Sequence, residues 1–198
     1  GMGGNCKIGI IANGKSKWIT TANQIKTVYS PGTMLYQIKD SLLGNGVISI
    51  QVLAMAAAEG MLVKIETTNI PAGISLVMVY GGATGKKFSR DGDIGADPES
   101  VFYLQPNYCT NNKFTLQKEA FLLEYGSETN KQKTGNTKSL NGFYPKSEVH
   151  LANANKQISP VELYNSTPDS LTVITGKINS IPKTELFWMI ENNAKTSP

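Results

Sequence analysis

The residues best suited to chemistry lie together in FSRDGDIGADPES, residues 88–100. Asp91, Asp93 and Asp97 follow one another at short spacing, directly after Arg90. Carboxylates in this pattern can bind calcium, act as general acid and base, bond the hydroxyl groups of a sugar, or stabilise turns. Each use requires different residues around the carboxylates.

An EF-hand is excluded by the spacing. Counted from Asp91, the loop requires an oxygen ligand at position 95 and a glutamate at position 102, and these positions are Gly95 and Phe102. An irregular calcium loop remains open, because calcium accepts carboxylates and carbonyls in flexible geometry.

Turns and a helix cap explain the same acidic residues without a ligand. Asp97, Pro98 and Glu99 have the order of a helix start, with Asp as the N-cap and Pro at the first position. Asp91-Gly92 is a turn dipeptide, and Arg90 can pair with any of the carboxylates. This network of turns and a cap is the preferred interpretation. The two alternatives are a loop that contacts a sugar or a protein, and a metal site.

Catalysis by these carboxylates is not predicted. A glycosidase needs two carboxyl groups roughly 5 to 10 Å apart with different pKa values, and a solvated loop gives neither Asp93 nor Asp97 a reason to change its pKa. His150 is the only histidine. It lies in the alternating run SEVHLANA, where we expect a polar residue on a strand face, and no nucleophile-elbow motif accompanies it.

Aromatic side chains are candidate platforms for sugar rings. Trp18, in SKWITT, is predicted to be exposed, and Trp188, in LFWMI, to fill the core. For any one aromatic residue, packing is the favoured role. The candidate ligand-binding residues are Arg90, Asp91, Asp93, Asp97, Trp18 and Tyr103; no catalytic residue, metal ligand or cofactor is predicted.

Composition narrows the possible partners. The net charge is +4, but Arg90 is the only arginine, so a nucleic-acid surface is not expected. No apolar run is long enough to span a membrane as a helix. In GGATGKK (81–87), Tyr80 and Lys87 stand where a phosphate-binding loop requires Gly and Ser or Thr, so a glycine-rich turn is expected.

The elements that must position these residues are short alternating or apolar runs separated by turn residues. Ser30-Pro31-Gly32-Thr33 has the order of a type II turn. The run 75–83 is nearly all apolar, which predicts a central strand buried on both faces. The predicted strands are 6–13, 17–21, 24–30, 33–40, 47–56, 61–69, 75–83, 100–105, 113–118, 120–126, 147–154, 171–178 and 184–191.

About a dozen strands at this spacing predict an all-β, two-sheet antiparallel sandwich, with residues 1–198 as one domain. AMAAAEGML (54–62) has helical propensity, but its Gly60 and its flanks favour a strand, a bend and a second strand. Residues 126–147 are predicted to form a long polar loop, mobile in its first part and anchored by Phe143-Tyr144-Pro145. Cys6 and Cys109 are expected to be free thiols.

Several segments resemble the bacterial family known as domain of unknown function 4450. They are GMGGNCKIGI, SPGTMLYQIKDSLLG, AAAEGMLVKIE and YGGATGKKFSRDGDIGADPESVFYLQP. The resemblance implies a sandwich of the galactose-mutarotase-like (supersandwich) type in large exported proteins of gut bacteria, and therefore a periplasmic or secreted location. It also implies a helical toroid domain, of the glycosidase type, that follows in the same parent protein.

Three functions follow from this resemblance and the residues together. The chain is expected to be a non-catalytic accessory domain of a carbohydrate-active protein, and such a domain should expose an apolar patch for its neighbour. The alternatives are a stand-alone sugar-binding module and a mutarotase- or epimerase-like enzyme. The enzyme requires His150 in a cleft beside a carboxylate, and the single histidine departs from the pattern that the resemblance implies.

Overall fold

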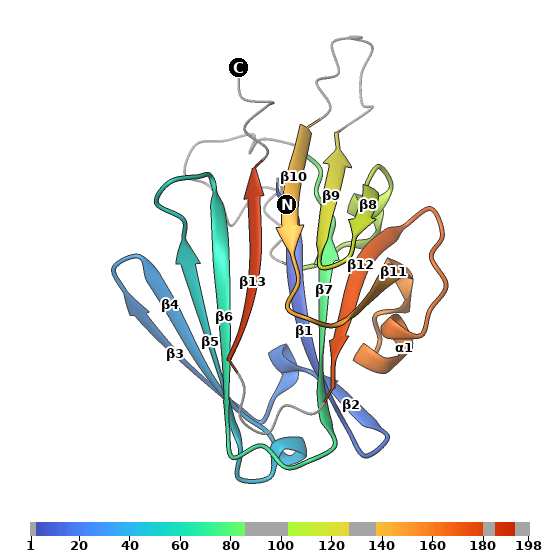
Figure 1. The fold of residues 1–198 in the computed structure, drawn as a ribbon. Coiled ribbons are helices and arrows are strands. Elements are labelled where there is room, and N and C mark those ends of the chain that lie inside the picture. Colours follow the sequence, from blue (N-terminus) through green and yellow to red (C-terminus); the bar gives the residue numbers. More distant parts are fainter. Residues whose placement is uncertain (1–2, 86–102, 127–137, 180–184, 193–198) are drawn as a thin grey trace, which may run out of the picture.

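The computed structural model describes residues 3–85, 103–126, 138–179 and 185–192, and these residues form two antiparallel β-sheets (Figure 1). The two-sheet antiparallel sandwich is thereby confirmed. The strands are β1 (Asn5–Ala12), β2 (Lys15–Trp18), β3 (Gln24–Ser30), β4 (Thr33–Lys39), β5 (Val47–Ala54), β6 (Gly60–Thr68), β7 (Ile74–Gly81), β8 (Lys113–Gln117), β9 (Ala120–Tyr125), β10 (Lys138–Phe143), β11 (Glu148–Asn153), β12 (Thr172–Ile178) and β13 (Glu185–Asn192).

The sheets differ in width. The smaller has the order β11-β12-β7-β1-β2, and the larger has the order β3-β4-β5-β6-β13-β10-β9-β8. β7 lies in the middle of the five-stranded sheet and is buried on both faces, as its apolar sequence predicts. In β6 the side chains alternate, with Val63 and Ile65 in the core between the sheets and Lys64 on the outer face.

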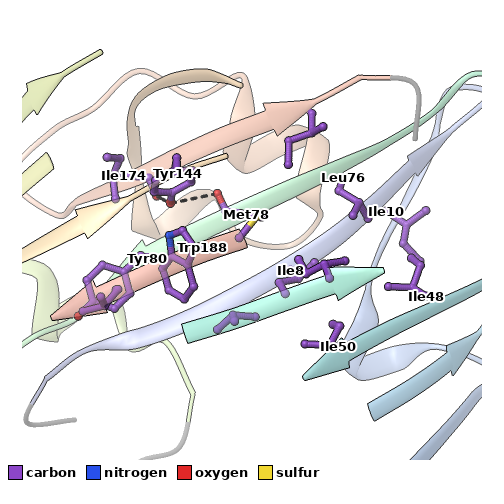
Figure 2. Close-up of a cluster of buried hydrophobic side chains, with 14 of the residues drawn as sticks. Ile8, Ile10, Ile48, Ile50, Leu76, Met78, Tyr80, Tyr144, Ile174 and Trp188 are labelled. Carbon is purple, nitrogen blue, oxygen red and sulfur yellow. Dashed lines mark hydrogen bonds between the residues drawn. The ribbon is translucent and has the colours of Figure 1, made fainter. Parts of the chain in front are cut away.

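Four aromatic rings pack together in the core, and Figure 2 shows three of them, Tyr80, Tyr144 and Trp188. The Trp188 ring lies 5.5 Å from the Tyr80 ring and 6.1 Å from the Tyr144 ring, measured between centroids, and the Phe121 ring lies 5.8 Å from Tyr80. The Tyr144 hydroxyl lies 3.4 Å from the Met78 carbonyl and 3.3 Å from the Ile174 carbonyl, both on the facing sheet. Trp188 fills the core and Tyr144 anchors its segment, as the sequence predicts.

A second layer covers the outer face of the five-stranded sheet. It contains the short helix α1 (Pro160–Tyr164) and the 3-10 helices η3 (Pro106–Cys109) and η4 (Ala154–Lys156). The sequence prediction missed α1, although Ser159-Pro160-Val161-Glu162 is a capping box with Pro at the first position. The Ser159 hydroxyl accepts a hydrogen bond of 3.2 Å from the Glu162 amide.

Two predicted elements are wrong, and a third is wrong in part: the predicted strand 17–21 ends at Trp18, and Ile19–Thr21 form the 3-10 helix η1. Residues 138–143 lie in the predicted long loop but form β10, which pairs with β9 and β13. This strand has a glycine at 142 and only one large buried apolar residue, Leu140, so its alternation is weak in the sequence. Residues 103–105 are not a strand, because Leu104 instead packs in the second layer and Pro106 begins η3. The first part of the predicted loop, 127–137, lies outside the described residues.

Other local predictions are confirmed. β5 and β6 are joined through a bend at 56–59, so 54–62 is a strand, a bend and a strand. The Pro31-Gly32 turn joins β3 to β4, with Gly32 at φ +77°. Cys6 and Cys109 are free thiols.

A buried carboxylate at the end of β4 holds the 3-10 helix η2 (Ser41–Leu43) and the entry to β3. Asp40 accepts hydrogen bonds from the Leu42 amide at 2.9 Å and the Asn23 amide at 3.0 Å, and it pairs with Lys17 of β2 at 2.8 Å. Burial by itself raises the pKa of a carboxyl group, but these hydrogen bonds outweigh it, so the Asp40 pKa lies below its ordinary value of 3.8.

We predict that Asp40→Ala lowers the free energy of unfolding at neutral pH by about 2–4 kcal/mol, because an N-cap and a buried ion pair are lost. Since the folded-state pKa is depressed, this stabilisation is complete above the ordinary value of 3.8 and is lost as pH falls through the folded pKa. Urea titrations from neutral pH downward measure both effects. Equal acid dependence in wild type and Asp40→Ala would contradict the assignment.

A second prediction concerns Gly142 of β10. A Cβ at this position would overlap the Phe121 ring, so Gly142→Ala is expected to cost about 1–3 kcal/mol of stability. The added cost should shrink in a Phe121→Leu background, where the ring is gone. Gly126→Ala is the matched control, because a Cβ added there meets no atom of the described residues within 4 Å. Additive costs in the double variant would contradict the proposed overlap.

Candidate functional site

The predicted ligand-binding residues Arg90, Asp91, Asp93 and Asp97 lie outside the described residues, so their predicted roles stay predictions. The structure does describe the chain on both sides, up to Gly85 and again from Tyr103.

Asn112 ties the two ends together. Its side chain is buried, its amide oxygen accepts a 3.1 Å hydrogen bond from the Ala83 amide, and its amide nitrogen donates to the Ala83 carbonyl at 2.7 Å. The same nitrogen lies 3.3 Å from the Tyr108 carbonyl in η3. The sequence analysis missed Asn112, because the pair Asn111-Asn112 indicates only a turn.

Trp18 is buried, which corrects the prediction that it is exposed. Only 6% of its surface is accessible, and it belongs to the apolar cluster of the second layer. The indole nitrogen donates a 2.9 Å hydrogen bond to the Gln157 carbonyl, and the Lys7 ammonium lies 4.2 Å above the ring. The prediction failed because the second layer covers the Trp18 ring, and the local sequence SKWITT gives no sign of that layer.

Tyr103 is exposed, with 65% of its surface accessible. It adjoins Leu104, which is buried in the second layer and whose carbonyl accepts a 3.1 Å hydrogen bond from the Gln157 side-chain amide. Gln157 also accepts a 2.9 Å hydrogen bond from Lys7. Gln157 therefore links the Trp18 side chain to the backbone next to Tyr103. Of the two predicted aromatic residues, Trp18 is packed in the second layer and Tyr103 is exposed beside it.

His150 lies half-buried on the outer face of β11, packed against α1. Its Nε2 atom is 2.7 Å from the Tyr164 carbonyl, and the two rings meet edge to face at 4.6 Å. Glu148, on the same strand face, accepts a 3.0 Å hydrogen bond from the Tyr164 hydroxyl and lies 3.8 Å from Lys177. Burial and, to a smaller extent, the hydrogen bond to Glu148 raise the Tyr164 pKa to about 12. The phenol therefore stays protonated and remains a hydrogen-bond donor.

These contacts attach the end of α1 to β11 and β12. The Nε2 atom of His150 is engaged by a backbone carbonyl, and the carboxylate of Glu148 by the Tyr164 phenol. His150 is thus a polar residue on a strand face, as the sequence predicts. Among the described residues it contacts α1 and does not lie in the kind of cleft that the enzyme alternative requires.

The outer face of the eight-stranded sheet carries an apolar row. Leu53, Leu62, Met189 and Phe143 lie side by side in register on β5, β6, β13 and β10. The first three are half-buried and Phe143 is 42% exposed. Phe187, 48% exposed, lies two residues from Met189 on the same face. We call these five side chains the outer apolar row.

Charged residues border the outer apolar row at Phe187. Lys64, its register partner on β6, pairs with Glu185 at 2.5 Å and with Glu66 at 3.2 Å. The hydrogen bond to Glu185 and, to a smaller extent, the one to Glu66 raise the Lys64 pKa. An apolar row with a charged border is typical of a protein contact surface.

Metal ligands and membrane helices are not found in the described part of the chain. Within it, no group of three or more His, Cys, Asp or Glu side chains is placed to hold a metal ion. None of the helices in these same ranges is long and apolar enough to cross a membrane.

Comparison with known protein families identifies a match over almost the whole sequence. The family model described as "domain of unknown function (DUF4450)" covers residues 1–197. No curated protein matches the chain. Since the model covers nearly all of its length and agrees with the sequence resemblance, the chain belongs to the DUF4450 family.

Proposed function

We propose that this chain is a non-catalytic accessory domain of an exported carbohydrate-active protein, and that it docks a helical domain of the same protein. The observation that carries the proposal is the outer apolar row. Leu53, Leu62, Met189, Phe143 and Phe187 lie on one face of one sheet, where Phe143 and Phe187 are 42% and 48% exposed and the other three are half-buried. A contiguous apolar surface of this kind is a common mark of a protein contact.

The geometry of the row suits a helix. Neighbouring strands lie about 4.8 Å apart, close to the roughly 5–6 Å between residues three or four apart on a helix face. A helix laid across β5, β6, β13 and β10 can therefore place successive apolar side chains on Leu53, Leu62, Met189 and Phe143. The Lys64–Glu185 pair offers polar contacts at the border. This supports the helical toroid domain as the partner.

The test measures binding between this chain and the separately expressed helical domain by titration calorimetry. Leu62→Glu is expected to weaken binding at least about ten-fold, because it places a charge at the centre of the row. Ile158→Glu is the matched control: Ile158 is 84% exposed next to the second layer, on the other side of the molecule, and binding should stay unchanged. Absence of binding by the wild-type chain, or equal effects of the two variants, would overturn the proposal.

Glycan contact is a second candidate function, favoured by the exposed ring of Tyr103. The ring directly follows the segment that contains Arg90, Asp91, Asp93 and Asp97, and Asn112 and Gln157 hold the backbone around it. An exposed aromatic ring beside hydrogen-bonding side chains is the combination that sugar sites use.

We expect an oligosaccharide from a panel of plant and host glycans to raise the melting temperature of the wild-type chain, by mass action on the folded state. Tyr103→Ala should abolish the shift and leave the unliganded melting temperature nearly unchanged. Trp18→Phe is the control, because it removes the indole and its bond to Gln157 but keeps an aromatic ring in the packed layer, away from Tyr103. A shift that survives Tyr103→Ala, or no shift with any glycan, would contradict this second function.

A further inference from the structure

β3 is an open edge of the eight-stranded sheet. Among the described strands it pairs only with β4, and all seven of its residues are exposed (Figure 1). Ile25 lies in register with the core residue Ile38 and faces the same side, yet 43% of its surface is accessible. Tyr29 on that side is 71% exposed. The smaller sheet therefore does not cover β3.

The hairpin turn determines which residues of β3 face outward. Ser30 and Thr33 flank the two-residue turn and pair with each other. A two-residue hairpin loop is closed by a hydrogen-bonded pair, and such pairs alternate along the ladder. Residues 24, 26, 28 and 30 therefore bond β4, and the backbone N–H and C=O groups of Ile25, Thr27 and Tyr29 point away from the sheet.

The sequence of β3, QIKTVYS, complements itself when it is paired antiparallel about Thr27. In this register Thr27 lies opposite Thr27 of a second copy, Ile25 opposite Tyr29, and Lys26 opposite Val28. The pairs formed by Ile25, Thr27 and Tyr29 are the ones whose backbone groups point outward, so all three can be hydrogen-bonded pairs. Ile with Tyr is a favourable β-branched–aromatic cross-strand pair.

The neighbouring registers are worse. Pairing about Lys26 places two lysines directly opposite each other, which is destabilising. Pairing about Val28 brings Ile25 opposite Pro31, which has no N–H to donate. The register about Thr27 uses all seven residues of β3 and keeps like charges apart.

We propose that β3 is a homodimerisation edge, on which a second copy of this chain adds its own β3 antiparallel about Thr27. The two-fold axis passes through the Thr27 pair, and the two eight-stranded sheets become one continuous sheet. This occupies backbone groups that an exposed, regular edge strand otherwise leaves open to unspecific pairing. The proposal is independent of the helical partner, because β3 lies at the sheet edge and the outer apolar row lies on β5, β6, β13 and β10.

The experiment measures the mass of the purified chain over a concentration series by sedimentation equilibrium. The wild-type chain is expected to dimerise. Val28→Lys places the introduced ammonium group of each copy opposite Lys26 of the other, and it should weaken the dimer about five-fold through two symmetric like-charge pairs. Val28→Glu creates two opposite-charge pairs and should strengthen the dimer, and added salt should reduce both effects.

Two further variants separate the edge from other surfaces. Thr27→Pro removes an outward N–H that β4 does not use, so the dimer should be lost while the melting temperature of the monomer changes little. Leu35→Lys is the matched control, because Leu35 is the register partner of Val28 on the same sheet face but lies one strand inward. It should leave the dimer unchanged. A monomeric wild-type chain, or the same response to Val28→Lys and Val28→Glu, would overturn the proposal.

Discussion

The close fit of aromatic rings between the two sheets is the constraint on which the rest of the structure depends. Trp188 and Phe121 come from the eight-stranded sheet and Tyr80 from the five-stranded one, and Tyr144 reaches across to the Met78 and Ile174 carbonyls (Figure 2). Glycines provide the room these rings need: a Cβ at Gly142 would overlap Phe121, and one at Gly176 would lie 2.7 Å from Tyr144. Large rings and missing side chains at facing positions set how closely the sheets approach.

The unequal width of the sheets determines which surfaces are available. The centre of the five-stranded sheet is buried on both faces, because the core covers one face of β7 and the second layer covers the other. The larger sheet has a core on one side only and extends beyond its partner at β3. Its outer face carries the outer apolar row and its edge carries unpaired backbone groups. Both proposed contacts therefore use the larger sheet, where the fold itself buries least.

The second layer has a different role. Gln157 bonds Trp18, Lys7 and the Leu104 backbone, and Asn112 bonds both sides of the segment 86–102. Side-chain amides suit this task because one amide group both donates and accepts. These hydrogen bonds hold the backbone next to the exposed Tyr103, and Trp18, which a sugar platform would expose, is instead packed within the second layer.

The sequence by itself determined the strands whose alternation is strong, the burial of β7, the Pro31-Gly32 turn and the two-sheet class. These depend on local periodicity and turn chemistry, which a single chain segment carries. Local sequence also contained the capping box of α1, although the prediction overlooked it. Tertiary structure alone decided that Trp18 is buried, that 138–143 is a strand, and that Asn112 and Gln157 act as connectors. Each of these depends on a partner distant in sequence: the second layer over Trp18, β9 and β13 beside β10, and Ala83 and Leu104 at the amides. Burial and pairing depend on the neighbour as much as on the residue, so where the local pattern is weak, as at Trp18 and 138–143, it does not specify them.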